Sequence, residues 1–340
     1  MRIALDAMGG DHAPAATVAG AVAAARAHGI EVALVGQVGA IEAELAKHQI
    51  TGLSLPLVEA PETIGMEEHP ATAARRKQGS SIHVGLREVR EGRAAALVSA
   101  GNSGAVMAAA LFVLGRVPGI ERPAIGTVMP TLAGGKVGRA LLIDAGANTD
   151  PKAGQLVQFG QMGAAWAERV FGVARPRVGL LANGEEPTKG SELVQEAHPL
   201  LAASGLNFSG NVEGRDIFAG KVDVVVTDGF AGNVALKASE GVAALIFGLL
   251  RAELGRNPLT KLLAAGLRPA FRRVNGQLDW RTTGGAPLLG VEGLTFIGHG
   301  RSDALAVENA IRVAKEAATG GAIDAIRSLG RGKGEGRGIA

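Results

Sequence analysis

One stretch of the sequence decides the fold class: residues 223–237 read DVVVTDGFAGNVALK. The apolar run 224–226 predicts a short buried strand. Gly229 and Gly232 are expected to open a turn, since glycine lets the backbone bend and approach other groups closely. Asn233 then begins a predicted helix, and Lys237, four residues later, lies on the same face of that helix. A strand, a glycine turn and a helix in this order are the repeating unit of an α/β fold.

The same unit recurs along the whole chain. Apolar runs predict strands at 2–7, 31–36, 55–60, 94–100, 125–130, 140–145, 177–182, 223–228 and 295–298. Alanine-rich patterns predict helices at 15–28, 39–49, 71–90, 103–115, 154–170, 191–204 and 303–319. Most of the strands are continuous apolar runs, as parallel strands covered on both faces are. We therefore expect an α/β fold with a wound, mostly parallel sheet and helices on both faces.

Composition limits the class of protein. The 340 residues suffice for one large α/β unit, expected over 1–330, with a flexible, basic, glycine-rich tail at 331–340. The chain has no Cys, which excludes disulfides, thiolate metal sites and a cysteine nucleophile. A net charge of +3 is too small to indicate nucleic-acid binding. The N-terminus lacks the pattern of a signal peptide, and charges and glycines interrupt every apolar run, so we expect a cytoplasmic protein.

Five predicted strand ends are rich in glycine and polar residues. They read DAMGGDHAP (6–14), SAGNSG (99–104), DAGANTDP (144–151), NGEEPTKG (183–190) and the long stretch 211–237. In open parallel α/β sheets, ligands bind at the carboxyl ends of strands, where helix N-termini point backbone N–H groups outward. A single turn of this kind is often only a helix cap and binds no ligand. Five in one chain favour an anion site at this edge of the sheet.

Two of these turns contain particular chemical groups. In 183–190, the flexible cation Lys189 precedes a predicted helix start and can neutralise phosphate oxygens, although the spacing is not that of a Walker A loop. In 99–104, Asn102 or Ser103 can cap the next helix. The run GNSGA at 101–105 is one residue away from a nucleophile elbow, so a serine hydrolase is an alternative, but the sequence identifies no histidine and acid partners for it.

Cofactor and metal motifs are absent from the sequence. No GxGxxG motif occurs, which counts against a dinucleotide cofactor. The seven histidines show no HExxH or similar ligand spacing, and Glu67-Glu-His69 is best interpreted as a solvated loop. We expect neither a cofactor nor a metal.

At these turns the sequence closely resembles the PlsX family, the phosphate acyltransferases of bacterial phospholipid synthesis. The resemblance spans nearly the whole chain and is carried by motifs in a fixed order. They are DAMGGDHAP, EEHPATAARRKQGSS, VSAGNSGAVMAAA, GIERPAIGTVMP, DAGANTD, GLLANGEEPTKG, FSGNVEGRDIFAGKVDVVVTDGFAGNVALKASEG and PLLGVEG. Where the family often has Thr, this chain has Ser103 and Ala231. A hydroxyl group at position 231 is therefore not essential.

The resemblance implies reversible transfer of an acyl group from acyl carrier protein to inorganic phosphate. The acyl phosphate product would feed a membrane glycerol-phosphate acyltransferase. The resemblance also implies two lobes around a cleft, a homodimer, and a fold related to phosphotransacetylases and isopropylmalate-type dehydrogenases.

The expected site residues follow from this reaction, which needs a phosphate site and stabilisation of an oxyanion. Lys189, Arg215 and Lys237 are the cationic candidates for phosphate, and Asn102, Ser103 and Asn233 are the candidates for the oxyanion. Asp228 would orient phosphate or handle the proton of the carrier thiol. The remaining expected binding residues are Gly104, Asp144, Asn148, Gly229 and Gly232.

A basic apolar segment at 249–274 reads LLRAELGRNPLTKLLAAGLRPAFRRV. Asn257-Pro258 predicts a break, and hence a helical hairpin. The segment contains one acidic residue, Glu253, and six basic residues, Arg251, Arg256, Lys261, Arg268, Arg272 and Arg273. The hairpin is expected either to pack against another lobe or subunit, with its basic residues extending to solvent, or to contact a membrane surface or the acidic carrier protein.

Two alternatives to carrier-dependent transfer stay open. One is a phosphotransacylase that uses acyl-CoA. The other, from a different class, is a non-catalytic regulator that binds acyl carrier protein or lipid on the same scaffold.

Overall fold

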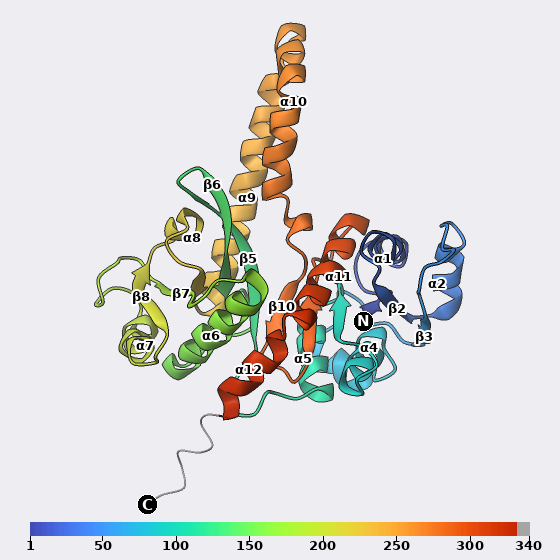
Figure 1. Ribbon diagram of the computed structural model, residues 1–340, viewed down its shortest axis with the longest axis horizontal. Helices are drawn as coiled ribbons and strands as arrows, with labels where there is room; N and C mark the ends of the chain where they lie inside the picture. Colours follow the sequence, from blue (N-terminus) through green and yellow to red (C-terminus); the bar gives the residue numbers. More distant parts are fainter. Residues whose placement is uncertain (332–340) are drawn as a thin grey trace, which may run out of the picture.

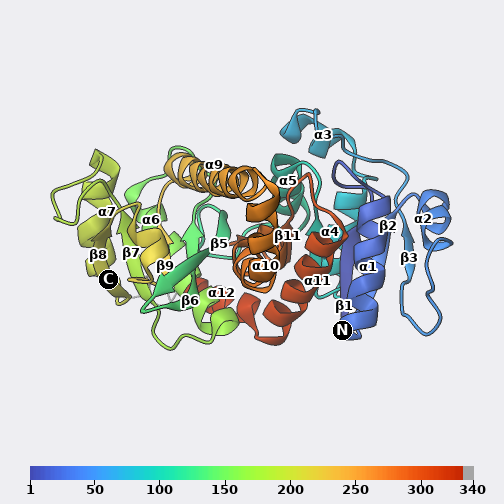
Figure 2. The ribbon, with the colours of Figure 1, turned by 90° about the horizontal axis from the view of Figure 1, so that it is seen from above.

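The computed structural model describes residues 1–331 and contains one eleven-stranded sheet with the order β3-β2-β1-β4-β11-β10-β5-β6-β9-β7-β8. Figure 2 shows this sheet crossing the full width of the molecule. The strands are β1 (Arg2–Asp6), β2 (Glu31–Gly36), β3 (Leu57–Glu59), β4 (Ala96–Ser99), β5 (Ala124–Ala133), β6 (Lys136–Ile143), β7 (Arg177–Leu181), β8 (Asn207–Val212), β9 (Val224–Val226), β10 (Ala286–Leu289) and β11 (Leu294–Ile297).

The sheet is mostly parallel, as the continuous apolar runs predict. β3, β2, β1, β4 and β11 are mutually parallel and form its first half, and β6, β9, β7 and β8 form a parallel second half. Three antiparallel pairings join the halves: β11 with β10, β10 with β5, and β5 with β6. Because three reversals leave the direction inverted, the strands of the two halves run in opposite directions. Their carboxyl ends therefore lie at opposite edges of the sheet.

Helices cover both faces of the sheet. They are α1 (Ala15–His28), α2 (Val38–Leu45), α3 (Pro70–Arg76), α4 (Ser81–Arg90), α5 (Ser103–Val113), α6 (Ala153–Trp166) with the π-helical turn Ala167–Phe171, α7 (Glu192–Ala202), α8 (Asp216–Ala219), α9 (Gly229–Leu254), α10 (Pro258–Leu278), the 3-10 turn η2 (Trp280–Thr282), α11 (Ala304–Thr319) and α12 (Ala322–Arg331). One core cluster packs α1, α6 and α11 against one face of the sheet. A second cluster packs α4 and α5 against the opposite face, and a third packs α9 there.

Small residues make this helix-on-sheet packing close. A Cβ atom at Gly163 of α6 would lie 2.7 Å from the Cγ1 atom of Val224 in β9. Because the core contains few aromatic rings, aliphatic side chains fill it, and the contact between Trp166 and Phe296, with ring centroids 5.8 Å apart, is an exception. The core thus holds the helices within direct reach of the strands whose ends carry the candidate residues.

Several elements differ from those expected. The helix predicted at 71–90 is two helices, because the chain turns at Lys77 and Ser80 caps α4. The strands predicted at 125–130 and 140–145 extend toward each other into the β5–β6 hairpin, closed by Gly134 and Gly135 with positive φ. β8 and β10 were not predicted. β8 contains polar residues and lies at the sheet edge, and β10 is only four residues long and contains Pro287.

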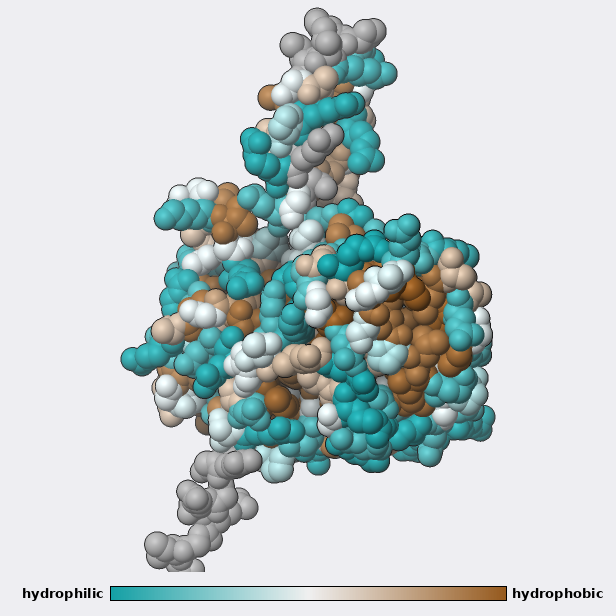
Figure 3. Space-filling model, turned by 45° about the vertical axis from the view of Figure 1, so that its right-hand side comes forward, coloured by the Kyte–Doolittle hydropathy of each residue, from teal (hydrophilic) through white to brown (hydrophobic). Residues whose placement is uncertain are grey.

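α9 and α10 form a helical hairpin that projects from the body of the molecule (Figure 1). α9 begins at Gly229 rather than at Asn233, and α10 begins at Pro258, with Asn257 as its cap. Figure 3 shows hydrophilic and hydrophobic residues side by side along this hairpin. The tail expected at 331–340 lies, except for Arg331 at the end of α12, outside the described residues.

Candidate functional site

The turns at the carboxyl edge of the first half are joined into one unit. Asp6 at the end of β1 is fully buried and accepts a hydrogen bond from the Ser99 hydroxyl at the end of β4, at 2.6 Å. Burial raises the pKa of the Asp6 carboxyl, and the hydrogen bond from Ser99 opposes that effect. The backbone N–H of Asp11 donates to the carbonyl of Gly300, after β11, at 2.8 Å. The ends of three parallel strands therefore form a single rigid platform.

Asn102 is the N-terminal cap of α5, as the sequence indicates. Its Oδ1 atom accepts a hydrogen bond from the N–H of Ala105, and its Nδ2 atom donates to the carbonyls of Met66 and Glu68, both at 3.1 Å. Both hydrogens of the amide are thus used in holding the 66–68 loop. Ser103 is exposed and Gly104 half-buried at the start of α5, where the first backbone N–H groups have no intrahelical partner.

The loop after β6 is organised by Asp144. This carboxylate is buried and accepts hydrogen bonds from the N–H groups of Ile125, Gly146 and Ala147 and from the N–H and Nδ2 atoms of Asn148. Burial raises its pKa, and the hydrogen bonds act in the opposite direction. Asp144 and half-buried Asn148 consequently fix the loop's shape, and no oxygen of Asp144 points into solvent.

This loop packs directly on the first turn of α9. The N–H of Gly229 donates to the carbonyl of Asn148 at 2.6 Å, and a Cβ atom at Gly232 would lie 1.9 Å from the carbonyl oxygen of Asp144. The two glycines that the sequence assigns to a ligand turn thus make room for protein backbone. Asp228 caps the helix by accepting from the N–H of Ala231 at 2.8 Å, and exposed Asn233 lies beside Gly146.

α9 links the two edges of the sheet. It begins at the carboxyl end of β9 and runs back over the sheet toward the carboxyl edge of the first half, where the Nζ atom of Lys237 lies 3.3 Å from Nε2 of His299. His299 follows β11 and belongs to the platform of Asp11 and Gly300. The helix therefore connects the Asp228 turn with the turns of the first half, although these ends face opposite directions in the sheet.

His299 is the functional candidate that sequence reasoning missed. Burial lowers the pKa of its imidazole, and the positive charges of Lys237 and Arg301 lower it further, against smaller opposing effects from Glu240 and Asp11. The ring also packs against Trp280, with centroids 5.3 Å apart. The available signal was local: the apolar run LTFI is followed by GHG, which is the same strand-then-glycine pattern as the other turns.

Lys189 and Arg215 belong to a separate group at the carboxyl ends of β7 and β8. Lys189 is exposed, and its stem lies over Gly184, where a Cβ atom would be 2.7 Å from the lysine Cγ. Arg215 pairs with Glu213 at 2.8 Å and more distantly with Glu185 at 3.7 Å. Its charge is compensated by these acids, far from the platform. Lys237, which pairs with Glu240 at 3.1 Å, is the predicted cation that lies beside the platform.

The arrangement suits anion binding combined with proton transfer. Lys237 and Arg301 supply two positive charges against the one negative charge of Glu240, which pairs with Lys237 at 3.1 Å and lies 3.9 Å from Arg301. They lie next to an imidazole that is neutral near pH 7, and the start of α5 supplies backbone N–H donors. Within residues 1–331, no group of three His, Asp or Glu side chains is placed to hold a metal ion.

Comparisons with known proteins identify the family of this chain. The family model described as "Fatty acid synthesis protein" matches residues 1–324. The phosphate acyltransferase of Pelotomaculum thermopropionicum is 51% identical, covering 96% of this chain and 94% of its own length. That of Herpetosiphon aurantiacus is also 51% identical, covering 93% of this chain and 94% of its own.

Two solved structures share the fold. A phosphotransacetylase from Streptococcus pyogenes superimposes with a TM-score of 0.60 at 17% identity, over 94% of each chain. A branched-chain phosphotransacylase from Enterococcus faecalis gives 0.56 at 13% identity, over 94% of this chain and 99% of its own. The sequence matches over nearly the full length establish the identity: this chain is an acyltransferase enzyme that belongs to the phosphate acyltransferase (PlsX) family.

Proposed function

We propose that the protein transfers a fatty acyl group reversibly from the thioester of acyl carrier protein to inorganic phosphate. The observation that carries the proposal is the contact of Lys237 with His299 beside the first-half platform, in a chain of the phosphate acyltransferase family. The site offers charge for phosphate and a neutral imidazole for a proton, and both are needed when phosphate attacks a thioester.

In this reaction a phosphate oxygen attacks the thioester carbonyl carbon. The C–O bond forms, the C–S bond breaks, and the proton of the phosphate is transferred to the departing thiolate. Lys237 and Arg301 would hold the phosphate, and the N–H groups of Ser103 and Gly104 would stabilise the oxyanion. His299 would accept and return the proton.

The other candidates would act around this centre. Asn102 would position the oxyanion donors through its cap on α5, and Asp144, Asn148, Gly229 and Gly232 would hold the start of α9. Asp228 and Asn233 would contact phosphate or the thiol from α9. Lys189 and Arg215, whose side chains are both exposed, would attract phosphate or the acidic carrier.

One assay tests the reaction and its alternatives. The enzyme is supplied with phosphate and either acyl carrier protein loaded with a fatty acyl group or the matching acyl-CoA, and acyl phosphate is trapped with hydroxylamine. We expect product from the carrier-bound donor. Product from acyl-CoA alone would favour a phosphotransacylase, and no product from either donor would favour a binding protein without catalysis.

We also propose that α9 forms a homodimer contact. Its projecting part exposes Val242, Leu245, Ile246 and Leu249, each more than half accessible, at helical spacing. An apolar stripe of this kind is costly in water and is typically covered by a second subunit. Leu245→Glu with Leu249→Glu should give monomers by analytical ultracentrifugation, whereas Leu200→Glu on α7, a comparably exposed leucine, should leave the dimer intact.

A membrane contact of the hairpin is a separate proposal. α9 is long and apolar enough to cross a membrane, by length and composition alone. Its first turns, however, are part of the site. The described basic side chains of the hairpin, including Arg251, Lys261 and Arg268, are exposed and would favour an anionic surface; the Arg272 side chain lies outside the described residues. Flotation with anionic liposomes at low salt should carry the enzyme upward, and an unbound enzyme would disprove the contact. Such an enzyme would act in the cytoplasm at the membrane surface, next to a membrane glycerol-phosphate acyltransferase.

A further inference from the structure

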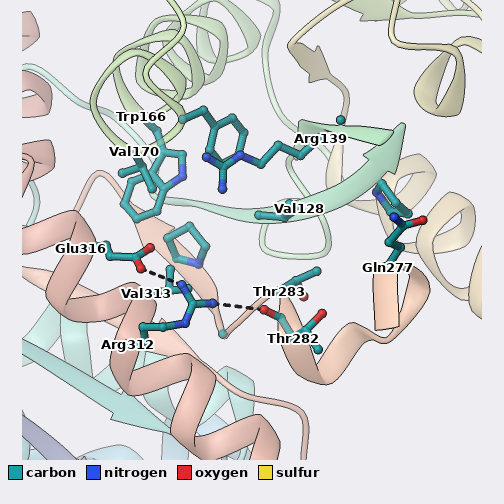
Figure 4. Close-up of a pocket in the computed structure, with 15 residues that line it drawn as sticks. Val128, Arg139, Trp166, Val170, Gln277, Thr282, Thr283, Arg312, Val313 and Glu316 are labelled. Atoms are coloured by element: carbon teal, nitrogen blue, oxygen red, sulfur yellow. Dashed lines mark hydrogen bonds and ion pairs between the residues drawn. The ribbon is translucent and has the colours of Figure 1, made fainter. Parts of the chain in front are cut away.

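A cavity of about 170 Å³ lies on the face of the sheet opposite α9 (Figure 4). Its walls come from the β5–β6 hairpin, the end of α6, the segment around Thr282 and Thr283, and α11. Arg139 shares a strand face with Leu141, which packs in the core cluster of α6, whereas Leu142 packs in the cluster of α9. The sheet therefore lies between this cavity and Lys237, and our proposed site does not include it.

One lining residue of the cavity, Trp166, has a buried hydrogen-bond donor without an acceptor. Trp166 is 1% exposed, and its Nε1 atom has no hydrogen-bond partner among the described residues. In Figure 4 the indole nitrogen lies on the side of the ring turned toward Arg139. A buried N–H group that lacks an acceptor costs about 1–3 kcal/mol, so a ligand that supplies an oxygen here would recover that energy.

Arg139 supplies an unpaired positive charge in the same cavity. No carboxylate of the described residues lies within ion-pair distance of its guanidinium, which instead stacks on the ring of Phe171 at 4.4 Å. Arg139 as a whole residue is exposed, and the burial of its guanidinium end lowers its pKa. The other two charged residues of the lining, Arg312 and Glu316, pair with each other at 2.6 Å. The lining thus carries one net positive charge.

We propose that this cavity binds a small monocarboxylate with a compact apolar body. The carboxylate would accept the hydrogen bond of Trp166 Nε1 and face Arg139, and the apolar body would contact Val170, Phe171 and Val313. One net positive charge is balanced by a monoanion, and the apolar walls disfavour a strongly hydrated phosphate dianion. A cavity of about 150 Å³ accommodates benzene, so benzoate is a probe of suitable size.

Occupancy would also stabilise the junction between the two halves of the sheet. Trp166 and Arg139 belong to elements of the second half, whereas Val313 belongs to α11, which packs on α1 and β4 of the first half. A ligand that contacts both sides binds the folded arrangement and not the unfolded chain. It should therefore raise the midpoint of thermal unfolding.

The direct test is an NMR titration of the full-length ¹⁵N-labelled enzyme with benzoate. The chain has two tryptophans, and Trp280→Phe assigns the two indole N–H signals. We expect a saturable downfield shift of the Trp166 signal at millimolar benzoate, together with a raised unfolding midpoint. Benzyl alcohol, which lacks the charge, and inorganic phosphate, which lacks the apolar body, should each bind at least about tenfold more weakly.

Variants separate the site from a general salt effect. Arg139→Gln should weaken benzoate binding at least about tenfold, a loss of about 1.4 kcal/mol. Arg26→Gln, which removes a surface arginine that donates to the Gln49 carbonyl, should bind like the wild type. A Trp166 signal that does not saturate, equal binding by phosphate, or unchanged binding in a folded Arg139→Gln variant would each overturn the proposal.

Discussion

The Nζ atom of Lys237 lies 3.3 Å from the Nε2 atom of His299, although 62 residues separate them in the sequence. A lysine ammonium only donates hydrogen bonds, so a hydrogen bond in this pair requires Nε2 to be unprotonated and the ring proton to lie on Nδ1. The pair thus places a cation beside a neutral base. This combination suits a phosphate that must be held and deprotonated in the same place.

Removing the lysine charge should raise the pKa of His299. The charge of Lys237 disfavours the imidazolium, so Lys237→Met relieves part of the depression and moves the pKa toward the ordinary value of 6.5. The ring signals of His299 in an NMR pH titration measure this shift. Turnover should fall about 10²-fold from the lost charge, and the acidic limb of the rate profile should move to higher pH. Lys221→Met, whose ammonium pairs with Asp216 and Glu185, should leave the pKa of His299 unchanged.

Gly232→Ala should disrupt the start of α9. The added Cβ atom would lie 1.9 Å from the carbonyl oxygen of Asp144. Because this clash is with the backbone of the Asp144 loop and not with a flexible side chain, a rotamer change cannot relieve it. We expect the free energy of unfolding to fall by about 1–3 kcal/mol in urea denaturation, with turnover reduced as well. Gly241→Ala in the same helix meets no atom within 4 Å and should stabilise the protein by up to about 1 kcal/mol. Equal effects of the two substitutions would contradict the packing role of Gly232.

Asn102→Ala distinguishes a positioning role from direct contact with the oxyanion. The substitution removes a helix cap and two hydrogen bonds to the 66–68 loop, so the free energy of unfolding should fall by about 1–3 kcal/mol. Asn102→Asp keeps the capping oxygen but loses the two donors, and it should recover part of this stability. A large fall in kcat at unchanged stability would instead indicate that the Asn102 amide contacts substrate.

Local patterns predicted most strands and helices, and long-range contacts explain most of the failures. The helix start at Gly229 was placed four residues late because two glycines in a row of polar residues resemble a turn. Their actual cause is the loop of Asp144 and Asn148, more than 80 residues earlier in the chain, which packs against them. The inverted second half was likewise unpredictable. β10 is antiparallel to both β11 and β5, so β5 still runs in the direction of the first half, and the inversion arises where β5 pairs with β6 in a hairpin. The sequence predicts these two strands but not their antiparallel pairing.

In the candidate site, too, local patterns could be predicted and long-range contacts could not. Lys237 could be identified from its spacing to Asn233 on one helix face, and the glycine turn after the run LTFI could have marked His299 as a candidate. Nothing local, however, indicates that these two residues, 62 positions apart, meet. Arg215 was selected for its charge alone, and the sequence does not reveal that Glu213 pairs with it. Charge and spacing therefore indicate which residues can bind an anion, and only the fold indicates which of them meet.

Asp228→Asn separates the charge of this residue from its role as a cap. Asparagine caps helices about as well as aspartate, so the N–H of Ala231 keeps its acceptor and the free energy of unfolding should change by less than about 0.5 kcal/mol. Asp228→Ala removes the cap and should cost about 1 kcal/mol. If the carboxylate orients phosphate or exchanges the thiol proton, both variants should lose turnover to a similar extent in the hydroxylamine assay. Turnover retained in Asp228→Asn and lost in Asp228→Ala would show instead that Asp228 serves the reaction only by fixing the first turn of α9.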